Sequence, residues 1–493
     1  MRKVSKRFWC VVLVGMSLAA FALPATASSH RQDGGGFEPL DRFIGSEMAR
    51  HRIPGLALGV TRGGEVVYLR GYGTAEDGRE VTPETPFYVG SVSKSFTALA
   101  VMQLVEAGEV ELDATVRRYI PWFAVADDAA SSEITVRHLL HQTSGLSDTG
   151  YRRGPVPADA TLEETVRDLE RARLTAPVGT TYQYFNLNYN VLGLIVQEVS
   201  GQPYGAYVEE RIFDPLGMEN SFVSREAAEA AGLAQGHNVV LGFPVARRQP
   251  YLSYDLPAGM IISSAEDMAR YAAALNNGGC FEEACVLSPE GTEALQTPPE
   301  GLDSPYAMGW EVHEEDGLDL VSHNGAVRTF FSNVTLLPEE GYGVVVLINQ
   351  NGLFHLLMAY EGLVDGVVSL LVGREPAGGI SMALVYGVII AVIVMDLALH
   401  GYRLARLPRW RRRWEYHRPR WAVLGLVARA LVALALLVGV PLLLITQAGT
   451  DATRVMLFYY MPGIASWLAL SAVLTLAEVW AKGRWMAAQR ASR

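Results

Sequence analysis

The chain has 493 residues, which is enough for one large domain or for two to three domains of average size. Its formal net charge is −11 at pH 7, and residues 28–379 hold 48 acidic side chains against 23 basic ones. Such an acidic surface repels phosphate backbones, so we expect no nucleic-acid partner.

The first 27 residues have the pattern of a secretory signal peptide. A basic start, MRKVSKR, is followed by the apolar run FWCVVLVGMSLAAFAL and by small residues that end at Ala27. We therefore expect residues 28–379 to form a domain outside the cytoplasm. Cys10 would leave with the signal. In an oxidising compartment Cys280 and Cys285 can close a small disulfide loop, which we favour over two free thiols.

The order of strands and helices in residues 28–379 predicts an α/β (α+β) fold. The stretch GLALGVTRGGEVVYLRGYG predicts two strands joined by a turn at Gly63 and Gly64. An apolar run from Ser91 to Ala107, ended by Gly108, predicts a helix. Strands return near the end, at YAMGWEV, LDLVSHNG, FFSNVTLLP and YGVVVLINQ. This order predicts one antiparallel sheet completed by both ends of the domain and flanked by helices.

Lys94 is unusual because only four of the 41 basic residues are lysines, and the other three lie near the chain ends. Arginine keeps its proton in proteins, whereas a buried lysine can become a neutral amine. Ser91 lies one helical turn before Lys94, on the same face of the predicted helix. A neutral Lys94 can therefore take the proton of the Ser91 hydroxyl and make it a nucleophile.

Two further short motifs follow, Tyr184-Phe185-Asn186 and His323-Asn324-Gly325. A tyrosine close to a lysine can share the role of base. Acyl transfer also needs donors that face the developing oxyanion. The helix start supplies one backbone N–H at Ser91, and a strand edge with a glycine supplies another, which we assign to Ala326.

Ser-x-x-Lys, Tyr-x-Asn and His-x-Gly in this order resemble the serine β-lactamase and penicillin-binding-protein superfamily, in its class C β-lactamase, D-aminopeptidase and esterase branch. Three further segments resemble that branch, so the resemblance covers about residues 37–355. They are ITVRHLLHQTSGL, RIFDPLGMENS and PAGMIISSAEDMARYAAAL. It implies a β-lactamase/transpeptidase-like fold and an acylated Ser91, with Lys94 and Tyr184 as the bases. The substrate-binding residues that it implies are Asn186, His323, Asn324, Gly325 and Ala326.

Two positions depart from the pattern of that branch. Thr329 stands where a second glycine is usual, and Arg328 precedes it, which predicts a narrowed site with an added cation. Phe185 takes the middle place of Tyr-x-Asn, where a small residue is common. Both changes bear on substrate preference.

We expect no metal site and no cofactor. His138 and His141 are three residues apart in RHLLHQTSG, but no glutamate follows His138 as it does in the His-Glu-x-x-His zinc motif. Structural roles are therefore the better interpretation of both histidines.

Three apolar stretches after residue 379 predict three membrane helices, since each has at least the ~20 residues that cross a bilayer core. They are residues 380–399, 421–445 and 457–480. Residues 400–420 carry eight arginines against one glutamate, and the tail after Trp480 carries four basic residues, so both are expected in the cytoplasm. Arg429, inside the second stretch, either snorkels to the surface or pairs with Asp396 or Glu478.

These observations predict a multi-pass protein of the cytoplasmic (inner) membrane with an extracytoplasmic serine hydrolase domain. Its expected substrate is a small molecule or peptide with an amide next to a D-amino acid. The architecture resembles membrane-bound prodrug-activating peptidases that remove an N-acyl-D-asparagine cap from nonribosomal peptides. A D-alanyl-D-alanine carboxypeptidase, an esterase, a β-lactamase and a β-lactam-acylated sensor remain open. Membrane lipids are expected partners, as is an exporter or a second copy of the chain.

Overall fold

The computed structural model describes residues 36–76, 78–151, 156–157, 160–417, 420–439, 442 and 461–491. The predicted signal peptide, residues 1–27, lies outside the described residues. The chain forms two units, Met1–Glu38 and Pro39–Arg493. The features below lie in the second unit, with α1 (Glu38–His51) beginning at the boundary.

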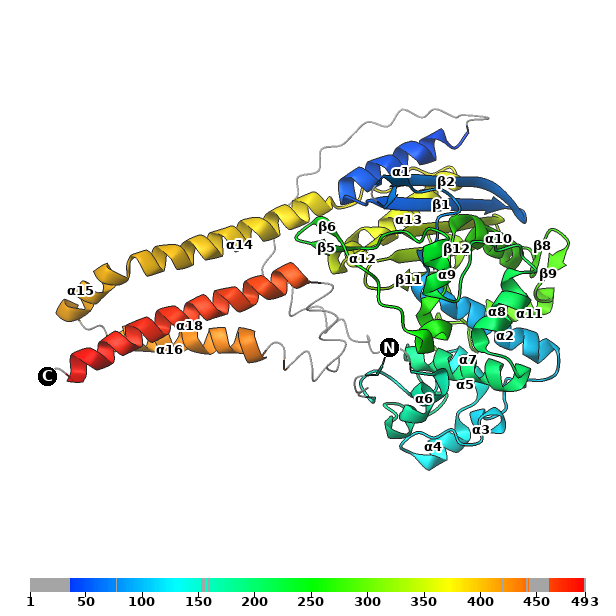
Figure 1. Ribbon diagram of the computed structural model, residues 1–493, viewed down its shortest axis with the longest axis horizontal. Coiled ribbons are helices and arrows are strands. Elements are labelled where there is room, and N and C mark those ends of the chain that lie inside the picture. The colour runs from blue at the N-terminus through cyan, green and yellow to red at the C-terminus, as the bar shows by residue number, and fades with distance from the viewer. Residues whose placement is uncertain are drawn as a thin grey trace. The chain divides into compact units, whose positions relative to one another are not determined.

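The predicted antiparallel sheet is present, and both ends of the domain complete it (Figure 1). Its seven strands run in the order β10-β11-β12-β13-β1-β2-β3. Gly63 and Gly64 form the predicted hairpin turn, and both adopt the positive φ angles that glycine tolerates. β1 pairs with β13 along its length, with Leu58 opposite Val346. The strands are β1 (Gly55–Arg62), β2 (Glu65–Glu76), β3 (Arg79–Glu80), β10 (Glu311–Glu315), β11 (Leu318–Ala326), β12 (Phe331–Leu337) and β13 (Tyr342–Ile348).

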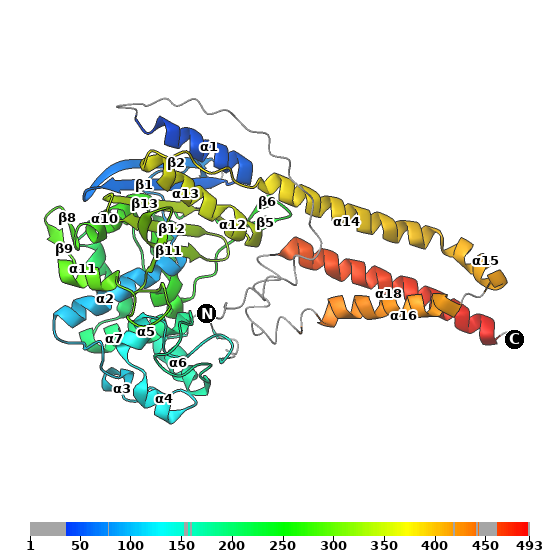
Figure 2. The same cartoon turned by 180° about the vertical axis from the view of Figure 1, so that it is seen from behind.

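Helices cover both faces of this sheet, which explains why β1, β12 and β13 are buried along nearly their whole length. α1 and α13 (Tyr360–Leu371) lie on one face and α10 (Ala265–Asn276) on the other (Figures 1 and 2). Tyr360 of α13 stacks on Phe331 of β12, with ring centroids 4.5 Å apart. α10 packs closely on β1, because a Cβ on Gly59 would lie 3.0 Å from the Ala265 carbonyl oxygen.

The helix predicted from Ser91 lies at the centre of the domain. It opens with a 3₁₀ turn, η1 (Gly90–Val92), and continues as α2 (Ser93–Glu106). Ten consecutive residues from Val92 to Val101 are buried, since α2 packs between α7 (Asn186–Ser200) and the π turn η5 (Leu256–Met260). Thr97 shows how the polar groups are satisfied, because its hydroxyl donates to the Pro257 carbonyl at 2.7 Å.

Shorter elements connect these layers. The helices are α3 (Val116–Tyr119), α4 (Asp128–Glu133), α5 (Val136–Leu140), α6 (Leu162–Arg167), η2 (Asp168–Arg171), α8 (Tyr204–Val208), η3 (Glu209–Phe213), α9 (Arg225–Ala230), η4 (Ser253–Asp255), α11 (Pro289–Leu295) and α12 (Leu353–Met358). The small strands are β4 (Phe87–Tyr88), β5 (His237–Val240), β6 (Phe243–Ala246), β7 (Ile262–Ser263), β8 (Cys280–Phe281), β9 (Ala284–Cys285) and β14 (Gln350–Asn351). The predicted disulfide joins Cys280 to Cys285 across the β8–β9 hairpin.

The prediction of three membrane spans is wrong for the part of the chain that the structure describes. Two described helices, Met382–Ala405 and Pro462–Gln489, are long and apolar enough to cross a membrane. They belong to α14 (Met382–Ala405) and α18 (Pro462–Ala491), and α15 (Leu407–His417) follows α14. The second predicted span gives a shorter apolar helix, Val423–Gly439, formed by α16 (Arg420–Leu434) and the π turn η6 (Ala435–Gly439). Residues 440, 441 and 443–445 of that predicted span lie outside the described residues.

Arg429 pairs with Glu478, one of the two acidic partners that were considered for it beside snorkelling. Its Nη1 lies 3.1 Å from Oε1 of Glu478, and Lys482 contacts the same carboxylate. Asp396 instead accepts a hydrogen bond from Trp467 Nε1 at 3.0 Å. The ion pair therefore joins α16 to α18 among apolar side chains, where charged groups need a partner.

We predict that Arg429→Leu lowers the stability of the full chain in detergent micelles by about 1–2 kcal/mol, because Glu478 loses an interhelical partner. Thermal unfolding measures the change. The matched control is Arg484→Leu, since Arg484 lies over the Trp480 ring of its own helix and makes no ion pair with another helix among the described residues. Equal unfolding temperatures for the two variants would show that the ion pair does not stabilise the bundle.

Candidate active site

The structure brings Ser91 and Lys94 into contact, as the motif predicts. Lys94 Nζ lies 3.1 Å from Ser91 Oγ and donates to the Ala258 carbonyl at 2.5 Å. Lys94 is fully buried in the first turn of α2, whereas Ser91 in the preceding turn remains half-buried. Ser91 thus keeps part of its surface exposed while its hydroxyl lies against an amine.

Burial makes Lys94 a plausible base at neutral pH. Removal from water lowers the pKa of Lys94 to about 7, although the negative charges of Asp255 and Asp148 oppose this change. Burial in turn raises the pKa of Asp148, and Lys94 acts against that increase. A pKa near the working pH gives a large neutral fraction without loss of basicity.

Tyr184 completes the cluster. Lys94 Nζ lies 4.9 Å from the centre of the Tyr184 ring, and the neighbouring Ser91 side chain acts to lower the pKa of the Tyr184 hydroxyl. Burial nevertheless raises the pKa of Tyr184 well above its ordinary value. The phenol therefore stays protonated near neutral pH, so the pKa order favours Lys94 as the group that accepts the Ser91 proton and Tyr184 as a relay.

His323 borders the site on β11, where the resemblance placed it. Its ring centroid is 6.3 Å from that of Tyr184, and Tyr306 Oη lies 3.2 Å from its Nε2. Burial and the neighbouring Lys94 lower the pKa of His323 to about 3. The imidazole is therefore neutral in the physiological range and adds no second cation beside Lys94.

Two glycines allow the backbone before Ser91 to approach β11. Gly90 has a φ of 53°, and a Cβ there would lie 2.7 Å from the Ala326 nitrogen. A Cβ on Gly325 would lie 2.0 Å from the Val89 carbonyl oxygen. These contacts bring the start of the 3₁₀ turn and the end of β11 together, as a pair of oxyanion donors from Ser91 and Ala326 requires.

The two asparagines of the motifs lie in different places. Asn186 is the first residue of α7, two residues after Tyr184, and its side chain is exposed. The structure does not bring the Asn324 side chain to Ser91, because neighbouring residues of a strand point to opposite faces. Asn324 accepts a hydrogen bond from Asn333 at 3.0 Å and lines a cavity with Asp365 on the α13 side of the sheet.

Phe185 and Thr329, the two residues that differ from the family pattern, have side chains buried in the core. Phe185 is 1% exposed and packs edge-on against Tyr151, with centroids 6.2 Å apart. Thr329 is also buried and donates to Gln249 Oε1 at 3.1 Å. It fits there because Gly236 has no Cβ, which would lie 2.3 Å from Thr329 Oγ1. The predicted narrowing of the site thus finds no support in how Thr329 packs.

Two residues near the site were missed by the sequence analysis. Tyr306 packs edge-on against Tyr184 and hydrogen-bonds His323, and it is the first residue of the segment YAMGW. Asp255 acts on Lys94 through its charge and accepts a hydrogen bond from Asn190 at 3.3 Å. Asp255 lies two residues before the segment PAGM, so a recognised motif was near, but nothing in the local sequence indicates that Asp255 acts on Lys94.

His138 and His141, the two histidines considered above as a metal pair, have structural contacts. His138 Nδ1 accepts from the Thr135 N–H at 3.2 Å and caps α5, and His141 Nδ1 is 3.4 Å from the Tyr306 carbonyl oxygen. Among the described residues, no group of three or more His, Cys, Asp or Glu side chains is placed to hold a metal ion.

A serine and a tyrosine around a buried lysine, beside an antiparallel sheet, are typical of the class of penicillin-binding-protein-like serine hydrolases. The family model described as Beta-lactamase matches residues 40–363, and the chain belongs to this family.

Several relatives extend the comparison. Protein flp of Staphylococcus aureus (strain MW2) is 28% identical over 318 residues, which are 64% of this chain and 63% of that protein. Unguisins hydrolase ungD' of Aspergillus campestris is 30% identical over 348 residues, 65% of this chain and 63% of that protein. The chain thus spans less than two thirds of the length of these curated relatives.

Two solved structures share the fold. The octameric penicillin-binding protein homologue from Pyrococcus abyssi superposes with a TM-score of 0.60 at 30% identity, over 69% of this chain and 78% of that chain. FmtA from Staphylococcus aureus superposes with a TM-score of 0.56 at 21% identity, over 72% of this chain and 95% of that chain. The first supports membership of the family, and the second supports the fold alone.

If Lys94 is the base, the rate at which a fluorophosphonate labels Ser91 should rise with pH through about 7 and level off above it, because only the neutral amine accepts the proton. Lys94→Arg should label at least ~100-fold more slowly, since a guanidinium keeps its proton. Lys482→Arg, far from the site in sequence, is the control. Rapid labelling of the Lys94→Arg variant would exclude Lys94 as the base.

Gly90→Ala should slow labelling of Ser91 by ~10²–10³-fold, because the new Cβ would push the Ala326 N–H out of place. Gly63→Ala is a matched control. Gly63 has a similar positive φ of 59°, but a Cβ there meets nothing within 4 Å. Both variants carry the same backbone strain, so equal labelling rates would show that Ala326 is not an oxyanion donor.

Proposed function

We propose that this protein is a membrane-anchored serine hydrolase that cleaves an amide next to a D-amino acid through an acyl-enzyme on Ser91. The observation that carries the hydrolase assignment is the 3.1 Å contact between Ser91 Oγ and the fully buried Lys94 Nζ. A charged lysine in that position destabilises the fold, which favours the neutral amine that a general base needs.

Acylation follows from the positions of these groups. Ser91 Oγ attacks the substrate carbonyl carbon while its proton passes to Nζ of neutral Lys94. The carbonyl oxygen becomes an oxyanion, which accepts from the N–H groups of Ser91 and Ala326. The carbon–nitrogen bond then breaks, and the leaving amine receives the proton from Lys94, directly or through the Tyr184 hydroxyl.

Deacylation uses the same groups, with water as the nucleophile and Ser91 Oγ as the leaving group. Lys94, neutral again, takes a proton from a water molecule that attacks the carbonyl carbon of the Ser91 ester. The second tetrahedral intermediate is held by the same two N–H groups. It collapses to a carboxylic acid, and the proton on Lys94 returns to Ser91 Oγ, which restores the free enzyme.

The finer substrate assignment rests on the resemblance to D-aminopeptidases and prodrug-activating peptidases. The exposed Asn186 at the start of α7 is suited to hydrogen-bond a substrate amide. A relative that carries the name of a hydrolase supports the reaction class. A D-alanyl-D-alanine carboxypeptidase, an esterase and a β-lactamase would use the same acyl-enzyme, so the choice among them depends on the substrate.

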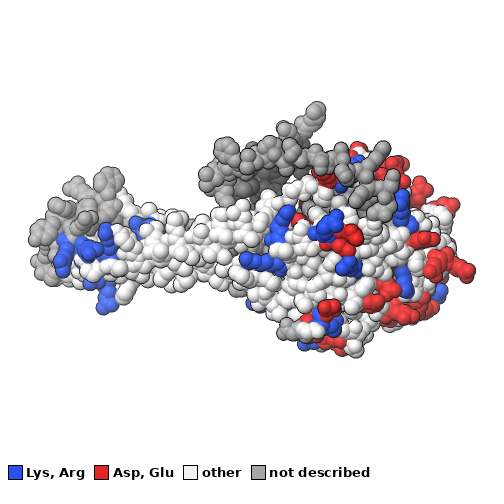
Figure 3. Space-filling model, turned by 90° about the horizontal axis from the view of Figure 1, so that it is seen from above, with Lys and Arg blue, Asp and Glu red and all other residues white. Residues whose placement is uncertain are grey.

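Membrane anchoring is supported by α14 and α18. Both are apolar enough to span a bilayer, and Figure 3 shows a nearly uncharged surface along the helices, with Lys and Arg side chains gathered at one end. Acidic side chains gather instead over the globular domain. The basic segment around α15, with the sequence LPRWRRRWEYH, is suited to the anionic lipids of a cytoplasmic leaflet.

The assignment is tested by mass spectrometry of the purified full chain incubated with an N-acyl-D-Asn peptide and its L-Asn twin. We expect cleavage of the D form alone, through a Ser91-linked acyl adduct, and none with Ser91→Ala. If fluorophosphonate labels Ser91 but neither peptide is cleaved, the enzyme is a serine hydrolase with another substrate. Acylation by a β-lactam without turnover would instead favour the sensor.

A further inference from the structure

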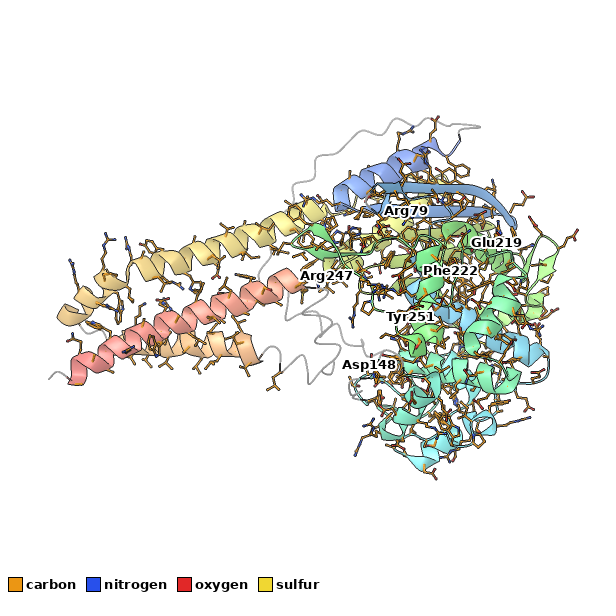
Figure 4. The ribbon with its side chains drawn as sticks, in the orientation of Figure 1. Arg79, Asp148, Glu219, Phe222, Arg247 and Tyr251 are labelled. Carbon is orange, nitrogen blue, oxygen red and sulfur yellow. A yellow bond between two sulfur atoms is a disulfide. The ribbon has the colours of Figure 1, made fainter. Side chains whose placement is uncertain are left out.

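A second cavity of about 310 Å³ lies in the same domain, and neither Ser91, Lys94 nor Tyr184 lines it. Its walls come from the β3 hairpin, the end of α9 and the segment that follows it, and the segment that follows β6. Figure 4 labels Arg79 and Arg247, which come from the first and last of these walls.

The lining of this cavity is basic, in a domain that is otherwise strongly acidic. Four arginines line it against two glutamates, Glu76 and Glu229. Glu229 is shared, because it accepts from Arg225 at 2.7 Å and from Arg248 at 3.0 Å. One carboxylate thus compensates two guanidinium groups, and Arg247 adds a further exposed positive charge.

Tyr88 gives this cavity an unused hydrogen-bond donor. Its side chain is 1% exposed and lines the cavity, and its hydroxyl has no partner among the described residues. The Tyr88 ring contacts two other rings, Phe330 with centroids 5.3 Å apart and Tyr251 with centroids 6.5 Å apart (Figure 4 labels Tyr251). A buried hydroxyl without a partner is unfavourable, which points to a ligand atom that accepts from it.

The cavity shares backbone with the catalytic site. Tyr88 is three residues before Ser91, and Phe330 follows Ala326 by four residues on the other oxyanion segment. The Ala234 N–H also donates to the Pro86 carbonyl at 3.0 Å, which ties the cavity wall to the strand that leads to Ser91. A group bound here would contact both segments that present the oxyanion donors.

We propose that this cavity is an anion-binding site that takes a carboxylate or phosphate group between Arg225, Arg247 and Arg248, with the Tyr88 hydroxyl as a neutral donor. Guanidinium groups match both anions in geometry as well as in charge. The anion is either free in solution or an acidic group carried by the substrate. The proposal goes beyond the hydrolase assignment and does not depend on it, because binding is measured without turnover.

The test is isothermal titration calorimetry of the full chain in uncharged detergent micelles, with sodium phosphate and sodium glutarate as probes at constant ionic strength. Two variants change the cavity. Arg247→Gln with Arg248→Gln removes two charges, and we expect at least ~10-fold weaker binding of both probes. Tyr88→Phe removes only the hydroxyl, and we expect binding weakened by ~3–10-fold with the unfolding temperature kept or raised.

Arg118→Gln is the matched control, because Arg118 pairs with Glu111 on another part of the surface and should leave binding unchanged. A second arm compares two peptides, one ending in a carboxylate and one in a carboxamide, on the Ser91→Ala protein. A preference for the carboxylate that disappears in the double variant identifies a substrate group, whereas phosphate binding without such a preference identifies a free anion. An unchanged dissociation constant in either cavity variant, or no binding by the wild type, would overturn the proposal.

Discussion

The structure depends on one constraint, the complete burial of the Lys94 amine against Ser91. A charged amine in the core of a domain is costly, so the surrounding protein has to lower its pKa and satisfy its hydrogen bonds. The Ala258 carbonyl in η5 accepts one of them, and the Ser91 hydroxyl lies within hydrogen-bond distance of the same nitrogen. α2 therefore has to run through the centre of the domain, between α7 and η5, rather than along its surface.

The sheet supplies the other half of the site through backbone alone. β11 reaches the turn before Ser91 because Gly90 and Gly325 have no side chains at the contact. The position of β11 is in turn determined by its neighbours, since β12 and β13 connect it to β1 at the start of the domain. The pairing of β1 with β13, which are far apart in the chain, thus helps to place β11 so that the Ala326 N–H lies close to the turn that holds Ser91.

Charge is distributed differently in each part of the chain. Acidic residues outnumber basic ones in the globular domain, yet four arginines line the cavity around Tyr88. Among the apolar helices, Arg429, Glu478 and Lys482 form one group of partnered charges. Because an isolated charge is costly in either setting, the arrangement separates charges that act on ligands from charges that hold helices together.

Local patterns in the sequence were sufficient for much of the fold and for the reacting groups. Ser91 and Lys94 are one helical turn apart, Gly63 and Gly64 suit a hairpin, and a short loop joins Cys280 to Cys285, so each feature depends only on near neighbours. The order of strands and helices also predicted the antiparallel sheet, which strands from both ends of the domain complete.

Other features were decided only by tertiary structure, because they depend on contacts between segments far apart in the chain. The face of β11 that carries Asn324, the approach of Asp255 to Lys94 and the place of Tyr306 beside His323 follow from how strands and helices pack. Apolar composition also predicted a span at residues 421–445, of which the structure describes a shorter apolar helix, Val423–Gly439. Composition and periodicity determine which residues are buried, but only packing determines which of them meet.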